Sequence, residues 1–147
     1  MIAYLDTSAL AKWYIAETGS EAFAEFIADV PDAVTCRLTV VELRCLLARR
    51  RRAGLLATEV EAFAYRRFTE QVAAGYVRVE PVSDARLLEA LELIERISEV
   101  PLRTLDALHL AAAEAAGATT VATADAVLRR AAEAVGMGVA FFGGAVR

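Results

Sequence analysis

Five short apolar segments separated by longer helical patterns constrain the fold of this chain most strongly. The apolar segments span residues 2–5, 33–36, 76–82, 119–122 and 138–142. Runs of this kind are typical of buried strands in a parallel sheet, because crossover helices cover both faces of such a sheet. We therefore predict an α/β fold in which helices cover a central parallel sheet.

Capping residues and glycines indicate where the helices begin and end. Two helices are expected at residues 7–16 and 20–28, and side chains that can cap a helix follow at Thr39, Thr58, Ser83, Thr104 and Asp125. The last four of these helices should end near residues 75, 97, 117 and 136. Thr39 with Glu42, and Thr58 with Glu61, have the spacing of a capping box. The expected order is βααβααβααβαβ in a single domain of residues 1–147.

Composition excludes several classes of protein. No uncharged run approaches the roughly 20 residues of a membrane-spanning helix. Asp6 interrupts the N-terminal apolar segment and no basic region precedes it, unlike in a secretory signal. We therefore expect a cytoplasmic protein with no membrane partner. Cys36 and Cys45 are not spaced as a metal-binding pair and His109 is the only histidine, so any metal ion would be held by oxygen.

Charge is distributed unevenly along the chain. The net charge of −4 argues against binding nucleic acid through a strongly basic surface. Residues 44–67 nevertheless carry a net charge of +5, which leaves −9 for the rest of the chain. Two interpretations stay open: the arginine run at residues 49–52 contacts phosphate, or it belongs to a solvated helix face.

Four carboxylates are predicted to gather at one edge of the sheet. Ligands of an open parallel sheet bind beyond the carboxyl ends of its strands, where helices also begin. Asp6 and Asp125 follow the first and fourth strands, and Glu42 and Asp106 lie in the first turns of helices that begin at this edge. Helix capping, the helix dipole or a turn explains each acid alone. Together they would repel one another without a cation, and an all-oxygen ligand set favours Mg²⁺ or Mn²⁺.

Several other side chains accompany these acids. Thr7, Ser8 and Thr123 place hydroxyls where they could orient a metal-bound water or a phosphate oxygen, although helix capping explains Thr7 and Ser8 equally well. His109 lies one turn after Asp106 on an alanine-rich helix. We interpret it as a core residue, or as support for a ligand, rather than as a ligand.

Four segments of the chain resemble the PIN-domain family, and VapC toxins of type II toxin–antitoxin systems in particular: residues 4–12, 38–43, 102–113 and 120–125. The resemblance covers essentially the whole chain. It implies a three-layer α/β/α sandwich with a central parallel sheet, and an Mg²⁺- or Mn²⁺-dependent endoribonuclease that cleaves structured RNA of the tRNA or rRNA class. It also implies catalytic and metal-binding roles for the four acids, Asp6, Glu42, Asp106 and Asp125, and a catalytic hydroxyl at Thr123.

In the leading hypothesis, Asp6, Asp106 and Glu42 bind one metal ion, and Asp125 binds a second or positions the water. The resemblance further implies a homodimer that a cognate antitoxin neutralises near the acids. Trp13, Tyr14 and the helices between residues 39 and 75 are candidate contact surfaces, and equally well core and solvent faces.

Two other functions fit parts of the pattern. Phosphatases resembling the haloacid dehalogenases also use an aspartate after the first strand, but they usually carry a second aspartate two positions later, where this chain has Ser8. Lys12 is the only lysine, so the lysine of those enzymes has no counterpart downstream. A non-catalytic PIN-like module that binds RNA or protein stays open, because an intact set of acids does not prove turnover.

Overall fold

A five-stranded sheet with parallel pairing throughout forms the centre of the computed structural model, which describes residues 1–144. Residues 145–147 of the predicted domain lie outside the described residues. The strand order is β3-β2-β1-β4-β5. The strands are β1 (Ile2–Leu5), β2 (Asp32–Cys36), β3 (Arg78–Glu80), β4 (Thr120–Thr123) and β5 (Gly138–Phe141).

Helices form the connections between consecutive strands. They are α1 (Thr7–Leu10), the 3₁₀ helix η1 (Ala11–Trp13), α2 (Ser20–Ala28), α3 (Arg37–Arg52), α4 (Thr58–Ala73), α5 (Asp84–Arg96), α6 (Thr104–Ala115) and α7 (Ala126–Ala134). The predicted order of strands and α-helices is confirmed, with η1 added. Within residues 1–144, no helix combines the length and apolar character that crossing a membrane requires.

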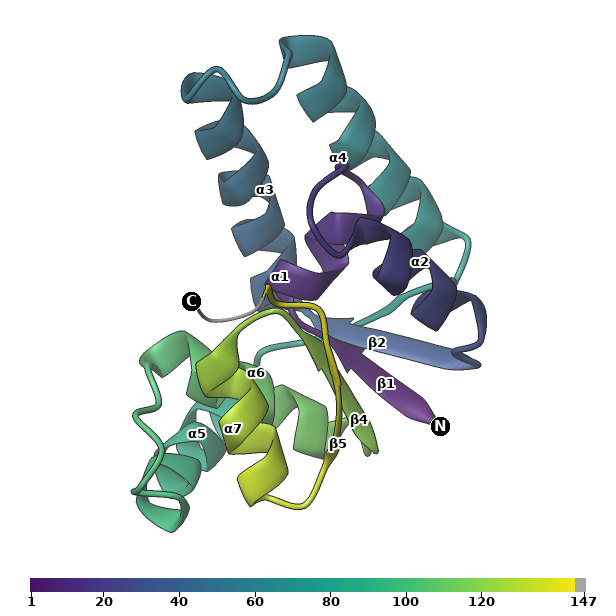
Figure 1. Cartoon of the computed structure of the whole chain (residues 1–147). Coiled ribbons are helices and arrows are strands. Elements are labelled where there is room, and N and C mark those ends of the chain that lie inside the picture. The colour runs from purple at the N-terminus through teal and green to yellow at the C-terminus, as the bar shows by residue number, and fades with distance from the viewer. Residues whose placement is uncertain (145–147) are drawn as a thin grey trace.

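Different helices cover the two faces of the sheet (Figure 1). Tyr4 of β1 packs into a core with α5, α6 and α7, whereas its neighbours Ala3 and Leu5 pack into a core with residues of α1, α2, α3 and α4. This alternation follows from the two-residue period of a strand. The predicted three-layer α/β/α sandwich is confirmed.

The first turn of α3 differs from the prediction. Arg37 begins the helix and Cys36 is its N-cap residue, so Thr39 does not cap it. The hydroxyl of Thr39 is buried and has no hydrogen-bond partner among the described residues. The predicted capping box of Thr39 and Glu42 is wrong, because the chain becomes helical directly after β2 and Glu42 therefore lies in the second turn.

The second predicted capping box is also wrong. Ala57 is the N-cap residue of α4 and Thr58 is already helical. Glu61 contacts Arg44 and Arg51 of α3 instead, so its carboxylate joins the two helices of this hairpin.

The remaining helix starts agree more closely with the sequence. Ser83 is the N-cap residue of α5, although its side chain makes no capping bond. Arg103, not Thr104, is the N-cap residue of α6. Asp125 caps α7, and its carboxylate accepts hydrogen bonds from the backbone N–H groups of Val127 and Leu128.

The predicted helix at residues 7–16 ends early. Its α-helical part stops at Leu10, and the N–H groups of Tyr14 and Ile15 both donate to the carbonyl oxygen of Ala11. This tighter turn directs both side chains into the core. Tyr14 packs edge-on against Phe68, which confirms its interpretation as a packing residue.

Candidate active site

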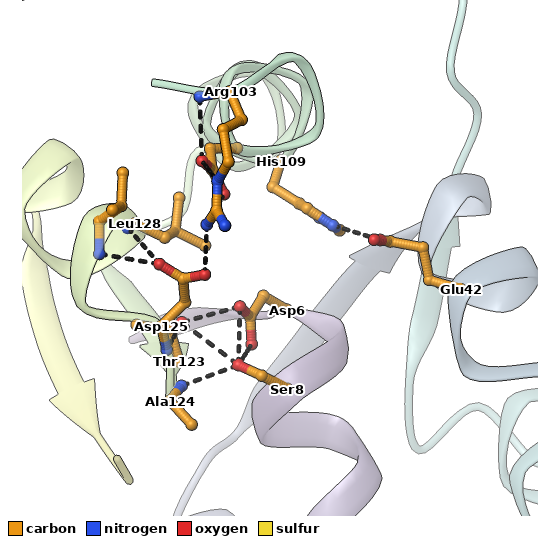
Figure 2. A network of polar contacts seen from close by, with 11 residues as sticks. Asp6, Ser8, Glu42, Arg103, His109, Thr123, Ala124, Asp125 and Leu128 are labelled. Atoms are coloured by element: carbon orange, nitrogen blue, oxygen red, sulfur yellow. Dashed lines mark hydrogen bonds and ion pairs between the residues drawn. The ribbon is translucent and has the colours of Figure 1, made fainter. Parts of the chain in front are cut away.

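One pocket collects all four predicted acids. It lies at the carboxyl ends of β1 and β4, has a volume of about 760 Å³, and is lined by Asp6, Glu42, Asp106 and Asp125 together with Arg49, Arg103 and His109. The prediction that the acids share one edge of the sheet is confirmed. Within the pocket, three sets of contacts hold the carboxylates in different ways (Figure 2).

Asp6 is buried and is held by uncharged donors. Its carboxylate accepts hydrogen bonds from the backbone N–H of Ala9 (2.9 Å) and the hydroxyls of Ser8 (2.8 Å) and Thr123 (2.7 Å). Burial raises the pKa of the Asp6 carboxyl, and the charge of His109 and these hydrogen bonds only partly offset that rise. A buried carboxylate with no cation bonded to it is costly, and a bound cation would compensate its charge.

The two hydroxyls that hold Asp6 also join the ends of β1 and β4. Thr123 donates to Asp6 and accepts from the backbone N–H of Asp125 at 2.9 Å. Ser8 donates to Asp6 and accepts from the backbone N–H of Ala124 at 2.9 Å. Both residues therefore fix the position of Asp6 relative to Asp125, and the Ser8 hydroxyl makes cross-strand contacts rather than a helix cap.

Arg103 bridges two of the predicted metal ligands. Its Nε and Nη2 atoms donate to the carboxylate of Asp106 at 2.7 and 3.1 Å, and Nη2 also donates to Asp125 at 2.5 Å. Burial raises the pKa of the Asp125 carboxyl, but hydrogen bonds from the backbone N–H of Leu128 and from Arg103 outweigh burial and lower the pKa. Sequence reasoning missed Arg103, although its spacing of three residues from Asp106 at a helix start was a usable signal.

Glu42 forms a third set of contacts with His109. Its carboxylate accepts from the hydroxyl of Thr7 at 2.9 Å and lies 2.5 Å from Nε2 of His109. Nδ1 of His109 lies 2.7 Å from the hydroxyl of Tyr4, which in turn donates to Sγ of Cys36. His109 is therefore the buried partner of an acid, which confirms its interpretation as support for a candidate ligand.

The contacts of His109 fit an imidazolium. Burial lowers the pKa of His109, but its interactions with Cys36 and Glu42 outweigh burial and raise the pKa to about 10. With both ring nitrogens protonated, His109 donates to Tyr4 and to Glu42, and the Tyr4 hydroxyl is free to donate to Cys36.

The acids fit a hard divalent cation in chemical type, and their contacts show what would have to change for one to bind. All are oxygen donors that line one pocket, and Asp6 lacks a bonded cation. In the described part of the chain, however, no three acidic, histidine or cysteine side chains converge closely enough to hold one metal ion. Arg103 contacts two of the acids and His109 contacts a third.

The arginine run at residues 49–52 is not uniform. Arg50 pairs with Glu17 at 2.5 Å and Arg51 contacts Glu61, so these two side chains serve the packing of the helices. Arg49 lines the pocket of the acids. Of these three arginines, Arg49 is the one that a ligand in the pocket could reach.

Comparisons with known proteins agree with this architecture. Solved structures with a similar fold include VapC20 of Mycobacterium tuberculosis, described as a sarcin-ricin loop cleaving toxin, with a TM-score of 0.70 at 21% identity, covering 88% of this chain and 94% of that one. VapBC2 of Rickettsia felis, solved with a DNA fragment from its promoter, has a TM-score of 0.67 at 14% identity and covers 97% and 99%. A toxin-antitoxin complex of Klebsiella pneumoniae has a TM-score of 0.57 at 16% identity and covers 84% and 86%.

These sequence identities are low, so the structural neighbours show only that the fold is shared. No protein with a curated description matches the chain. The family model of the PIN domain matches residues 3–134, which is most of the sequence. The protein therefore belongs to the PIN-domain family and has a VapC-like fold.

Proposed function

We propose that this protein is a Mg²⁺- or Mn²⁺-dependent endoribonuclease of the VapC type. The observation that carries the proposal is Asp6, a carboxylate with 4% of its surface exposed and no bonded cation, in a pocket that three further acids line. PIN domains and VapC proteins are generally nucleases. The neighbour described as a sarcin-ricin loop cleaving toxin supports structured RNA as the substrate.

Different residues of the chain would bind the cation, position a ligand and contact the RNA. Asp6, Asp106, Asp125 and Glu42 would hold the cation. When bound, a cation of this type binds a phosphodiester oxygen and lowers the pKa of a bound water. Ser8 and Thr123 keep the Asp6 carboxylate in place through their hydroxyls. Arg49, at the wall of the same pocket, is placed to contact a phosphate of the RNA.

The proposal includes a protein partner and a second copy of the chain. Toxin–antitoxin complexes among the structural neighbours support a cognate antitoxin as the partner. A homodimer would cover the apolar side chains that α5 leaves exposed, Leu87, Leu88, Leu91 and Ile94.

One observation favours a second function, a PIN-like module that binds RNA or protein without cleaving it. Asp106, Asp125 and Glu42 each contact a cation of the chain itself, because Arg103 pairs with the two aspartates and His109 pairs with Glu42. A module of this kind needs no divalent cation and would not hydrolyse RNA.

Cleavage of a structured RNA in the presence of Mg²⁺ or Mn²⁺ tests the proposal. The wild-type protein should cleave and lose activity with a chelator, and Asp6→Asn should reduce the rate at least about a hundredfold through lost metal binding. Asp29→Asn, which changes an exposed carboxyl at the end of α2, is the matched control and should cleave like the wild type. Equal metal-dependent cleavage by Asp6→Asn would contradict the role of Asp6, and no cleavage by the wild type would favour the binding module.

A further inference from the structure

Arg103 lies between two of the acids that line the pocket, Asp106 and Asp125, and contacts both. We infer that Arg103 is a resident counter-ion, meaning a cation of the chain itself, which competes with the divalent cation for Asp106 and Asp125. The inference rests on the proposed function, because it deepens the account of the same pocket.

The contacts of Arg103 engage both acids at once. Both carboxylate oxygens of Asp106 accept hydrogen bonds from the guanidinium, and Oδ2 also accepts from the backbone N–H of Arg103 at 3.0 Å. In Asp125, Oδ2 accepts from the guanidinium while Oδ1 caps α7. Every oxygen of the two carboxylates therefore has a donor, and the guanidinium would repel a divalent cation placed beside it.

The surroundings of Arg103 allow it to leave. Its side chain is 63% exposed, so the guanidinium can exchange the two carboxylates for water at little cost. Asp106 and Asp125 differ in this respect, because their side chains are only 10% and 30% exposed. The acids stay fixed at the pocket wall while their counter-ion can be replaced, which is the arrangement that ion exchange requires.

Calorimetric titration with Mn²⁺ tests the inference without measuring cleavage. Arg103→Gln removes the competitor and one positive charge, so its affinity for Mn²⁺ should rise about tenfold above that of the wild type. Arg103→Lys keeps the charge but cannot form the bidentate contact, and should fall between the two. Arg49→Gln is the matched control, since it removes a charge from the same pocket and no described carboxylate pairs with Arg49; its affinity should rise less.

A second readout follows the guanidinium directly. The Nε–H signal of Arg103 in a ¹H–¹⁵N spectrum is identified by its absence in Arg103→Gln. Saturating Mg²⁺ should move this signal to the position of a solvent-exposed arginine, as the contact with Asp106 is lost.

The outcomes separate this inference from the proposed function. Tighter Mn²⁺ binding by Arg103→Gln, with a shifted Arg103 signal in the wild type, supports the inference. Equal binding by the wild type and Arg103→Gln, or an unmoved signal at saturating Mg²⁺, overturns the inference and leaves the proposed function standing. No Mn²⁺ binding by either protein overturns both.

Discussion

His109 and Arg103 both pair with carboxylates of the same pocket, but one side chain is buried and the other is exposed to solvent. His109 is 6% exposed and contacts Glu42 from within the fold, with the Tyr4 hydroxyl on its other side. Arg103 is 63% exposed and contacts Asp106 and Asp125 from the solvent.

The two contacts therefore differ in how easily they can be broken. An imidazolium that lost Glu42 would stay buried without a charged partner, which is costly, whereas the guanidinium would become hydrated. The pocket thus contains His109 as a permanent cation and Arg103 as a replaceable cation. Its remaining carboxylate, Asp6, is bonded to neither of them. This difference indicates that a divalent cation would replace Arg103 at Asp106 and Asp125 but would share Glu42 with His109.

The largest expected effect comes from removing the permanent cation. His109→Ala leaves Glu42 without its counter-ion and opens a cavity beside Tyr4, so the free energy of unfolding should fall by about 2–4 kcal/mol. Urea denaturation measures this loss. His109→Gln keeps an N–H donor for Glu42 and should lose less. A loss below about 1 kcal/mol for His109→Ala would mean that the buried contact is as dispensable as an exposed one.

The same buried contact should also make the stability depend on pH. The pKa of His109 is raised from 6.5 to about 10 in the folded protein, so the folded state holds its proton more tightly than the unfolded state does. The stabilising contribution is complete below pH 6.5 and is lost as the pH rises toward 10. The melting temperature of the wild type should therefore fall over this range, and fall less in His109→Gln. If the melting temperatures of the two proteins fell equally with rising pH, His109 would not be protonated in the folded state.

The smallest expected effect comes from removing Arg103, the replaceable cation. Arg103→Gln should lower the free energy of unfolding by no more than about 1 kcal/mol, because the ion pairs of an exposed arginine contribute little. The same urea denaturation measures it. A loss as large as that of His109→Ala would make Arg103 a structural residue and remove its interpretation as a replaceable cation.

The sequence predicted the sheet and the position of the acids because both follow from local patterns. Short apolar runs marked the strands, and the direction of a parallel sheet then placed Asp6, Asp125, Glu42 and Asp106 at one edge. Neither step requires knowledge of how side chains pair.

The side chains that pair with the acids could not be predicted from local sequence patterns. Glu42 and His109 are 67 residues apart in sequence, and only the tertiary fold brings them together. Local reasoning instead assigned Glu42 to a cap with Thr39. That assignment failed because the position of β2 sets the start of α3, two residues before Thr39. Arg103 is the intermediate case, since its contact with Asp106 is local but its contact with Asp125 is not.

The most direct test of the metal centre is a crystal structure of the wild-type protein grown with Mn²⁺, with an anomalous difference map that locates the ion. We expect a peak bonded to the carboxylate of Asp6, and the guanidinium of Arg103 turned away from Asp106 and Asp125. A map without a peak in this pocket, with Arg103 still bridging the two acids at saturating Mn²⁺, would contradict the account.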